Sequence, residues 1–124
     1  MKITTFNPQI VTKNQDEVVQ LFEELGFEKT HTLEAFEDKV IKGIRMKDAN
    51  GFYLDVSKAE AAPPQDLVFI RMNVDNFDEA YEILVARGFK NFYGDDTVKT
   101  SSAKSAIMIS PSGFAFNLIE HKHH

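Results

Sequence analysis

An internal repeat constrains the fold more than any other feature of the sequence. Nine residues in the first half of the 124-residue chain are identical to the residue found 62 positions later. They include Asn14 and Asn76, which precede predicted helices, and Gly26 and Gly88, which follow them. Caps and turns restrict which residue fits, so identities at these positions indicate repeated backbone geometry. Because two copies are too few for a solenoid, the sequence predicts a pair of similar modules.

The two halves share one order of predicted elements, namely a strand, a helix and then three strands. In the first half the strands are 4–12, 28–35, 40–47 and 52–57, and the helix is 15–25. In the second half the strands are 67–74, 89–93, 103–109 and 114–119, with a helix between Asn76 and Gly88. We expect side-chain caps at both helix starts, where Asn14 and Asn76 would accept from the backbone amides of Glu17 and Glu79.

The segment 59–65 separates the two predicted modules, which cover about 1–58 and 66–120. This segment is small and polar and contains two prolines, which is typical of a short linker. Half of this chain would be only marginally stable by itself. We therefore expect one domain, residues 1–124, made of two βαβββ modules.

Composition argues against several classes of protein. Without Cys the chain has no disulfide, no thiolate nucleophile and no thiolate metal site, and we expect a cytoplasmic protein. A formal net charge of −5 leaves no basic stripe for nucleic acid. Hydrophobic residues at 43% and charged residues at 27% are usual for a globular domain. We therefore expect neither nucleic acid nor a membrane as a partner.

The order of elements, the helix start at 74–80 and the terminal hairpin at 111–118 resemble the vicinal oxygen chelate superfamily. This family includes glyoxalase I, extradiol dioxygenases, fosfomycin-resistance enzymes and bleomycin-resistance proteins. The resemblance implies an α+β fold in which tandem βαβββ modules form paired curved mixed sheets around a cleft. It also implies a homodimer, and leaves open whether modules pair within one chain or across two.

Strand alternation divides the side chains of each predicted sheet between a helix-covered face and the cleft. On the outer face, Phe52, Leu54 and Val56 are expected against the first helix, and Val68 lies in the apolar stripe expected against the second. The candidate ligand-binding residues on the other face are Asn7, Gln9, Tyr53, Asp55, Phe69, Arg71 and Asn117.

Metal-using members of the family carry one ligand on the first and last strand of each module. The corresponding positions here are Asn7, Asp55, Phe69 and Asn117. Only Asp55 is a strong ligand, the two amides are weak ones, and a phenylalanine offers no lone pair. We therefore expect no metal ion and no other cofactor.

Several roles remain open for individual residues. Asp55 could pair with Arg71, bond to a backbone amide, act as a general base or anchor a cationic ligand. Tyr53 and Phe69 could form flat walls for a planar guest or could simply pack. His31 could be an acid or base, or lie exposed to solvent. The terminal histidines could capture a transition metal or fray; they are His121, His123 and His124.

The resemblance and the weak donor set together predict a small-molecule-binding protein of the glyoxalase and bleomycin-resistance type, without a catalytic metal. The alternative is an enzyme: a metal-dependent lyase or dioxygenase of the glyoxalase I type, or a metal-free isomerase that uses Asp55 with His31. A third hypothesis is a regulatory or interaction module whose cleft is filled by its own phenylalanines.

Overall fold

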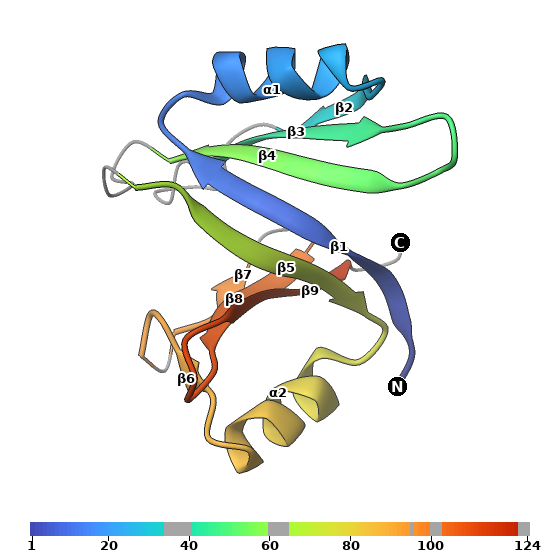
Figure 1. Ribbon diagram of the computed structural model, residues 1–124. Helices are drawn as coiled ribbons and strands as arrows, with labels where there is room; N and C mark the ends of the chain where they lie inside the picture. The colour runs from blue at the N-terminus through green and yellow to red at the C-terminus, as the bar shows by residue number, and fades with distance from the viewer. Residues whose placement is uncertain (34–40, 60–64, 95, 100–102, 122–124) are drawn as a thin grey trace. The chain divides into compact units, whose positions relative to one another are not determined.

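The computed structural model describes residues 1–33, 41–59, 65–94, 96–99 and 103–121 (Figure 1). Within these residues the chain forms two helices and nine strands. Their order is β1 Ile3–Thr12, α1 Gln15–Glu24, β2 Glu28–Leu33, β3 Ile41–Lys47, β4 Tyr53–Ala59, β5 Leu67–Val74, α2 Phe77–Ala86, β6 Lys90–Asn91, β7 Val98–Lys99, β8 Ala103–Ile109 and β9 Ala115–His121. The predicted α+β class with tandem βαβββ modules is confirmed, and the second module carries the short β7 in addition.

The chain divides into two compact units. The first unit is Asn7–Val68, and the second unit combines Met1–Phe6 with Phe69–His124. The N-terminal segment joins the second unit through Lys2, whose backbone N donates to Asp75 Oδ1 at 2.6 Å. The carbonyl of Lys2 in turn accepts from the Asp75 backbone N at 3.1 Å. The prediction of a single domain with a linker at 59–65 stays a prediction.

Each unit contains a mixed sheet built with the same topology. In the first unit the strand order is β2-β3-β4-β1, and in the second it is β6-β8-β9-β5, with β7 also paired to β8. The first and last strands of each module pair in parallel, and the other pairs are antiparallel. Helix α1 lies along one face of the first sheet (Figure 1).

The internal repeat extends to the register of the strands. Gln9 is the partner of Asp55 in the parallel pair of the first unit. In the second unit Arg71 is the partner of Asn117. Arg71 lies 62 positions after Gln9, and Asn117 lies 62 positions after Asp55. Since a slip of one residue would turn every side chain to the other face, equal registers mean that equivalent positions face equivalent surroundings.

The two helix starts differ, although the sequence predicts the same cap for both. Asn76 accepts from the backbone N of Glu79 at 3.1 Å, as expected. Asn14 makes no side-chain cap bond, so that prediction is wrong. Its backbone has φ −108° and ψ 49°, whereas Asn76 has the extended conformation that directs a cap side chain toward the helix. The Asn14 backbone N donates instead to Thr12 Oγ1 at 3.0 Å.

The helix ends are equivalent and follow the prediction. The backbone N of Phe27 donates to the carbonyl of Phe22 at 2.9 Å, and that of Phe89 donates to Leu84 at 3.0 Å. Both bonds close a turn that passes through a glycine with positive φ, Gly26 in the first case. The ring of Phe27 packs edge-on against Phe22, with 5.5 Å between centroids.

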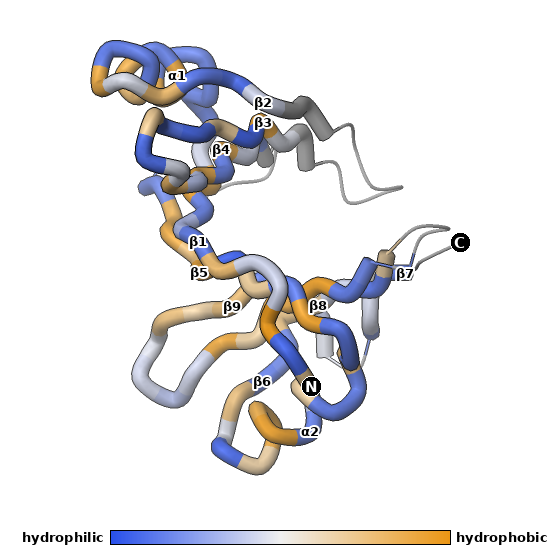
Figure 2. Tube along the Cα trace, turned by 90° about the vertical axis from the view of Figure 1, so that its right-hand side faces the viewer, coloured by the Kyte–Doolittle hydropathy of each residue, from blue (hydrophilic) through white to orange (hydrophobic). Residues whose placement is uncertain are grey.

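Each unit has its own hydrophobic core between its sheet and its helix. The first core contains Val19, Ile44, Met46, Leu54 and Val56. The second contains Met72, Val74, Phe77, Ala80, Leu84, Ala106, Met108 and Leu118. The equivalent residues Met46 and Met108 are both fully buried. Helix α1 is mixed in hydropathy and α2 is more hydrophobic (Figure 2).

Two apolar residues expected on the helix-covered faces are exposed instead. Phe52 precedes β4 and is 66% exposed, because it lies in the turn and not on the pleated strand. Val68 is 65% exposed and precedes Ile70, where the pairing of β5 with β9 begins. The alternation therefore predicts the faces correctly only within the paired strands.

Neither described helix has both the length and the apolar character that crossing a membrane would require.

Candidate functional site

Four side chains of the first unit form a polar cluster on the sheet face opposite α1. We define the polar cluster as Asn7 of β1, Arg45 of β3, and Tyr53 and Asp55 of β4. Alternation explains this placement, because the strand neighbours of Arg45 and Asp55 are core residues packed with the helix. The backbone register places Arg45 directly opposite Asp55.

Three members of the polar cluster are joined by hydrogen bonds. Asn7 Nδ2 donates to Asp55 Oδ2 at 2.7 Å. Arg45 Nη1 lies 3.4 Å from the same carboxylate oxygen. Arg45 Nη2 donates to Asn7 Oδ1 at 3.3 Å. Asparagine thus bridges the two charged groups, and each member restrains the orientation of the others.

The guanidinium group of Arg45 also lies over an aromatic ring. Its Cζ is 4.2 Å from the centroid of Tyr53, and the ammonium of Lys47 is 5.4 Å from the same centroid. A cation at such a distance is attracted by the ring face. Tyr53 is therefore a platform over which the guanidinium lies.

The charged side chains of the polar cluster are largely, but not completely, shielded from water. The side chain of Asp55 is 5% exposed and that of Arg45 is 17% exposed. Low exposure strengthens the interaction between the two charges, which cancel each other. Lys47 adds a further positive charge near the Tyr53 ring.

A second buried polar pair continues the row on the same face. Gln9 Nε2 donates to Ser57 Oγ at 2.9 Å. Both residues are buried, and Gln9 lies beside Asp55 in the register of β1 and β4. This face of the first unit therefore offers several fixed hydrogen-bonding groups.

The remaining predicted ligand-binding residues belong to the second unit. Arg71 is buried, and its Nε donates to Asn73 Oδ1 at 3.2 Å. Asn117 is its backbone partner, and Phe69 is half-buried. Since Asp55 lies in the first unit, its pairing with Arg71 stays a prediction.

The structure thus brings three predicted site residues together, Asn7, Tyr53 and Asp55, with Gln9 adjacent. Sequence reasoning missed Arg45. A lone arginine between Ile44 and Met46 in an alternating strand was the signal that could have identified it.

The histidines add little to this site within the described residues. The backbone of His31 pairs with Arg45 in β2 and β3, but its side chain lies outside the described residues. His121 ends β9, and His123 and His124 lie outside the described residues.

The side chains of the polar cluster do not fit a divalent metal ion as they are arranged. Asn7 Oδ1 and Asp55 Oδ2, the oxygens that would ligate it, both contact the cationic guanidinium of Arg45. A second cation at this position would meet like charge and only one carboxylate. Elsewhere in the described chain, no group of three or more His, Asp or Glu side chains is arranged for a metal.

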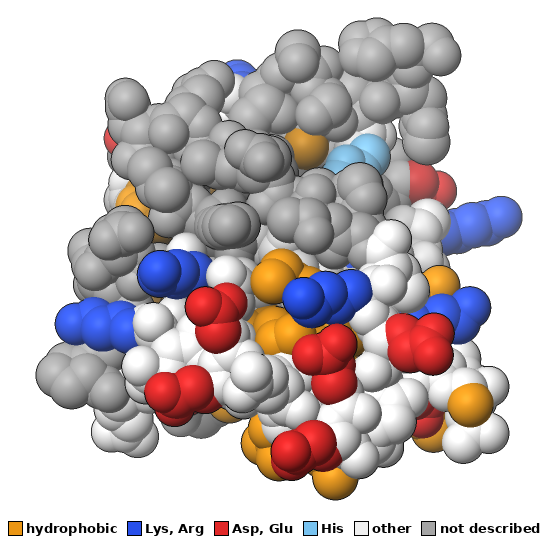
Figure 3. Space-filling model, turned by 90° about the horizontal axis from the view of Figure 1, so that it is seen from above, with side chains coloured by type: hydrophobic (Ala, Val, Ile, Leu, Met, Phe, Trp, Pro, Cys, Tyr) orange, Lys and Arg blue, Asp and Glu red, His pale blue; other side chains and the backbone are white. Residues whose placement is uncertain are grey.

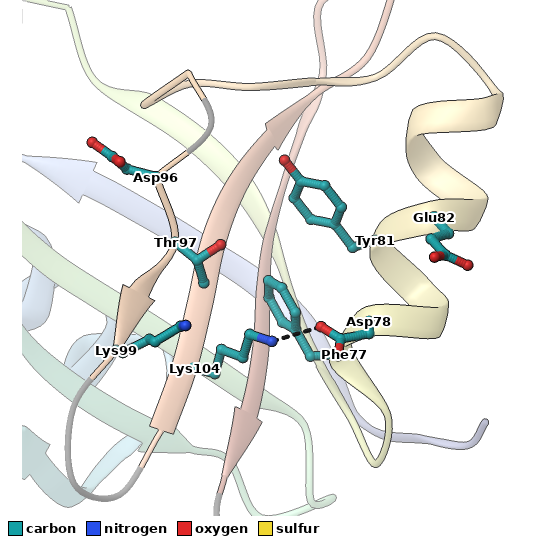
Figure 4. A pocket seen from close by; sticks show the side chains of 8 residues that line it. All are labelled: Phe77, Asp78, Tyr81, Glu82, Asp96, Thr97, Lys99 and Lys104. Carbon is teal, nitrogen blue, oxygen red and sulfur yellow. Dashed lines mark hydrogen bonds and ion pairs between the residues drawn. The ribbon is translucent and has the colours of Figure 1, made fainter.

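The second unit has a groove of about 660 Å³ beside α2, which the sequence did not predict (Figure 4). Its lining residues are Phe77, Asp78, Tyr81, Glu82, Asp96, Thr97, Lys99 and Lys104. Lys104 Nζ is 2.6 Å from Asp78 Oδ1 and 4.8 Å from the ring centroid of Phe77. Three of the eight lining residues are acidic and two are basic, so the groove has no strong charge preference.

Comparisons with known proteins identify the fold. No protein-family model and no curated protein sequence matches the chain. A glyoxalase/bleomycin resistance protein/dioxygenase superfamily member from Vibrio splendidus has a TM-score of 0.65 and 14% identity, covering 96% of this chain and 99% of its own. A hypothetical protein from Bacillus halodurans has a TM-score of 0.74 and 14% identity, covering 100% and 98%.

A third solved structure is an enzyme with its ligand. It is a variant of methylmalonyl-CoA epimerase from Streptomyces coelicolor in complex with 2-nitronate-propionyl-CoA. Its TM-score is 0.67 and its identity 16%, and the match covers 98% of this chain and 100% of the epimerase. These likenesses confirm the resemblance that the sequence indicated: the chain has the fold of the glyoxalase/bleomycin resistance protein/dioxygenase superfamily, the vicinal oxygen chelate fold.

Proposed function

We propose that this protein binds a small organic molecule at the polar cluster and does so without a catalytic metal. The observation that carries the proposal is the guanidinium of Arg45, which lies over the ring of Tyr53 and is hydrogen-bonded to Asn7 and Asp55. Binding sites for small molecules combine an aromatic or apolar wall with a few fixed polar groups. The polar cluster supplies both within one sheet face.

The fold is compatible with such a guest. The Streptomyces coelicolor epimerase variant was solved with a propionyl-CoA derivative, so a protein of this fold accommodates an organic ligand. Likeness of fold does not transfer the reaction, because one fold supports many chemistries. We therefore propose binding as the function, and leave catalysis as an outcome of the test.

We further propose a cytoplasmic homodimer that engages neither nucleic acid nor membrane. The net charge of −5 supports the first of these exclusions. On the face seen in Figure 3, acidic and basic side chains lie among one another, and the described side chains form no continuous basic stripe. Size-exclusion chromatography with light scattering tests the dimer, and a mass of 14.1 kDa would contradict it.

A thermal-shift screen with a library of small organic acids, amides and amines tests the binding function. A guest that binds only the native state adds about 2.7 kcal/mol of apparent stability at a concentration 100 times its Kd. The variant Tyr53→Leu should lose this stabilisation. The matched control Lys104→Met, altered in the groove of the second unit, should keep it. Equal stabilisation in wild type and Tyr53→Leu would place the guest elsewhere and refute the proposal.

Elemental analysis separates the proposal from the metal-enzyme alternative. The protein is purified without an added tag, with His123 and His124 replaced by Ala to remove adventitious metal binding. We expect less than one tenth of an equivalent of any transition metal, on the order of background. A stoichiometric ion that disappears in Asp55→Ala would favour a metal-dependent lyase or dioxygenase instead.

A further inference from the structure

We infer that the guest carries a carboxylate group and that Arg45 recognises it. This inference rests on the proposed binding function and names the class of ligand. It follows from the hydrogen-bond capacity of the guanidinium, from the length of its contacts and from the charge around it.

The guanidinium of Arg45 has more N–H donors than it has hydrogen bonds to the described residues. Arginine presents five N–H donors, and within the described chain Arg45 donates two hydrogen bonds, to Asp55 and to Asn7. Every buried side-chain nitrogen or oxygen among the described residues has a partner. The side chain of Arg45 is 17% exposed, so part of its donor capacity remains accessible to a guest.

The contacts that Arg45 already makes are long. Charge-assisted bonds between N–H and carboxylate oxygen usually measure about 2.7–2.9 Å. Arg45 lies 3.4 Å from Asp55 Oδ2 and 3.3 Å from Asn7 Oδ1. The same Asp55 oxygen accepts from Asn7 at 2.7 Å, so its stronger bond goes to the amide. Asp55 and Asn7 are thus positioning residues that orient the guanidinium without saturating it.

The fork shape of arginine suits a carboxylate because two parallel N–H groups can meet its two oxygens. The Tyr53 ring and the bonds to Asp55 and Asn7 restrain the Arg45 side chain, which lowers the entropy lost when an anion binds. Lys47 adds positive charge near the same ring. A neutral amide would gain less electrostatic attraction from these cations, and a cationic guest would be repelled by them.

The internal repeat supplies a comparison within the same molecule. The residue equivalent to Arg45 in the second unit is Ile107, and the residue equivalent to Tyr53 is Ala115. The cation and its platform therefore occur in one copy only. In the groove of the second unit, Lys104 forms a short ion pair with Asp78 at 2.6 Å, and a lysine lacks the planar pair of N–H groups that arginine presents.

Three probes of equal shape and different charge test the inference: benzoate, benzamide and benzamidinium. Binding is measured by isothermal titration calorimetry at low ionic strength. We expect benzoate to bind roughly tenfold more tightly than the other two. Arg45→Met should abolish the preference. Arg45→Lys keeps the charge and loses the fork, so it should retain only part of it. Lys104→Met should behave as wild type, and circular dichroism confirms that each variant is folded.

The variant Asp55→Asn distinguishes the proposed effect of Asp55 on ligand binding from a purely structural role of Asp55. An asparagine at this position can still accept from Arg45, but it no longer competes as a charged acceptor. We expect benzoate to bind several-fold more tightly to this variant, while benzamide changes little. Weaker benzoate binding with unchanged benzamide binding would contradict the inference.

The outcomes distinguish this inference from the proposed function. Equal affinity for benzoate and benzamide, both lost in Tyr53→Leu, would overturn the carboxylate preference and leave small-molecule binding intact. Absence of benzoate binding would also overturn the preference, and the library screen decides the proposed function independently. A preference for benzoate that persists in Arg45→Met would assign recognition to another residue and refute the role of Arg45.

Discussion

The ion pair between Arg45 and Asp55 should contribute more to stability than a shorter pair at the surface. The comparison pair is Lys104 and Asp78, in which Nζ and Oδ1 are 2.6 Å apart. The two pairs differ in exposure: the side chains of Arg45 and Asp55 are 17% and 5% exposed, and those of Lys104 and Asp78 are 23% and 78% exposed. If solvent exposure rather than distance sets the strength of an ion pair, the coupling free energy should be larger for Arg45 and Asp55, although their charged atoms are farther apart.

The expected magnitudes follow from distance and solvent screening. At 3.4 Å and an effective dielectric constant near 20, Coulomb attraction is about 5 kcal/mol before opposing costs. Desolvation and side-chain ordering remove much of it, so we expect a coupling free energy of about 2 kcal/mol for Arg45 and Asp55. For a pair with one strongly exposed member, we expect about 0.5 kcal/mol.

Two double-mutant cycles measure these couplings. The first combines Arg45→Met and Asp55→Asn, and the second combines Lys104→Met and Asp78→Asn. Free energies of unfolding come from urea titrations followed by far-ultraviolet circular dichroism, which suits a chain without Trp. In 1 M NaCl the surface coupling should nearly vanish, and the coupling of Arg45 with Asp55 should largely persist.

Equal couplings in the two cycles, or a stronger coupling for Lys104 and Asp78, would refute the reasoning. Either result would mean that distance outweighs exposure in setting the coupling free energy of an ion pair. A coupling near zero for Arg45 and Asp55 would remove the support for the role of Asp55 in positioning Arg45.

Other predictions concern the repeat. Met46→Ala and Met108→Ala should each lower the free energy of unfolding by about 3 kcal/mol, because both side chains are fully buried at equivalent positions; a difference above about 1.5 kcal/mol in urea titrations would show that the cores are not equivalent. Asn76→Ala should cost about 1 kcal/mol and Asn14→Ala clearly less, since only Asn76 caps its helix; equal losses would contradict the observed caps. Gly88→Ala should lower the melting temperature, because φ is +90° and a Cβ would lie 3.0 Å from a proline ring carbon; an unchanged melting temperature would show that the turn adapts.

The fold was largely predictable because its signals are local and occur twice. A glycine after an apolar helical stripe predicts the helix ends, and both are found at Gly26 and Gly88. The caps show the limit of such reasoning. Asn14 and Asn76 are each followed, two positions later, by Asp-Glu. Only the Asn76 side chain caps its helix, because the backbone conformations of the two asparagines differ.

The candidate site was predictable only in part. Alternation within paired strands places Asn7, Tyr53 and Asp55 on one face, as the structure confirms. Arg45 was missed because its role depends on the register of β3 against β4, which places it opposite Asp55. The turn between these strands sets that register, because it pairs Lys47 with Tyr53 and so places Arg45 opposite Asp55 two residues further on, a step that alternation within one strand does not supply.

The sequence alone determined the order of the elements, the two cores and the weak supply of metal ligands, because these depend on residue type and short-range spacing. The tertiary structure decided which polar groups meet. A hydrogen bond requires two atoms about 3 Å apart, and residues as distant in the chain as Asn7 and Asp55 reach that separation only when parallel strands are in register. The guanidinium on its tyrosine platform is therefore a property of the folded sheet.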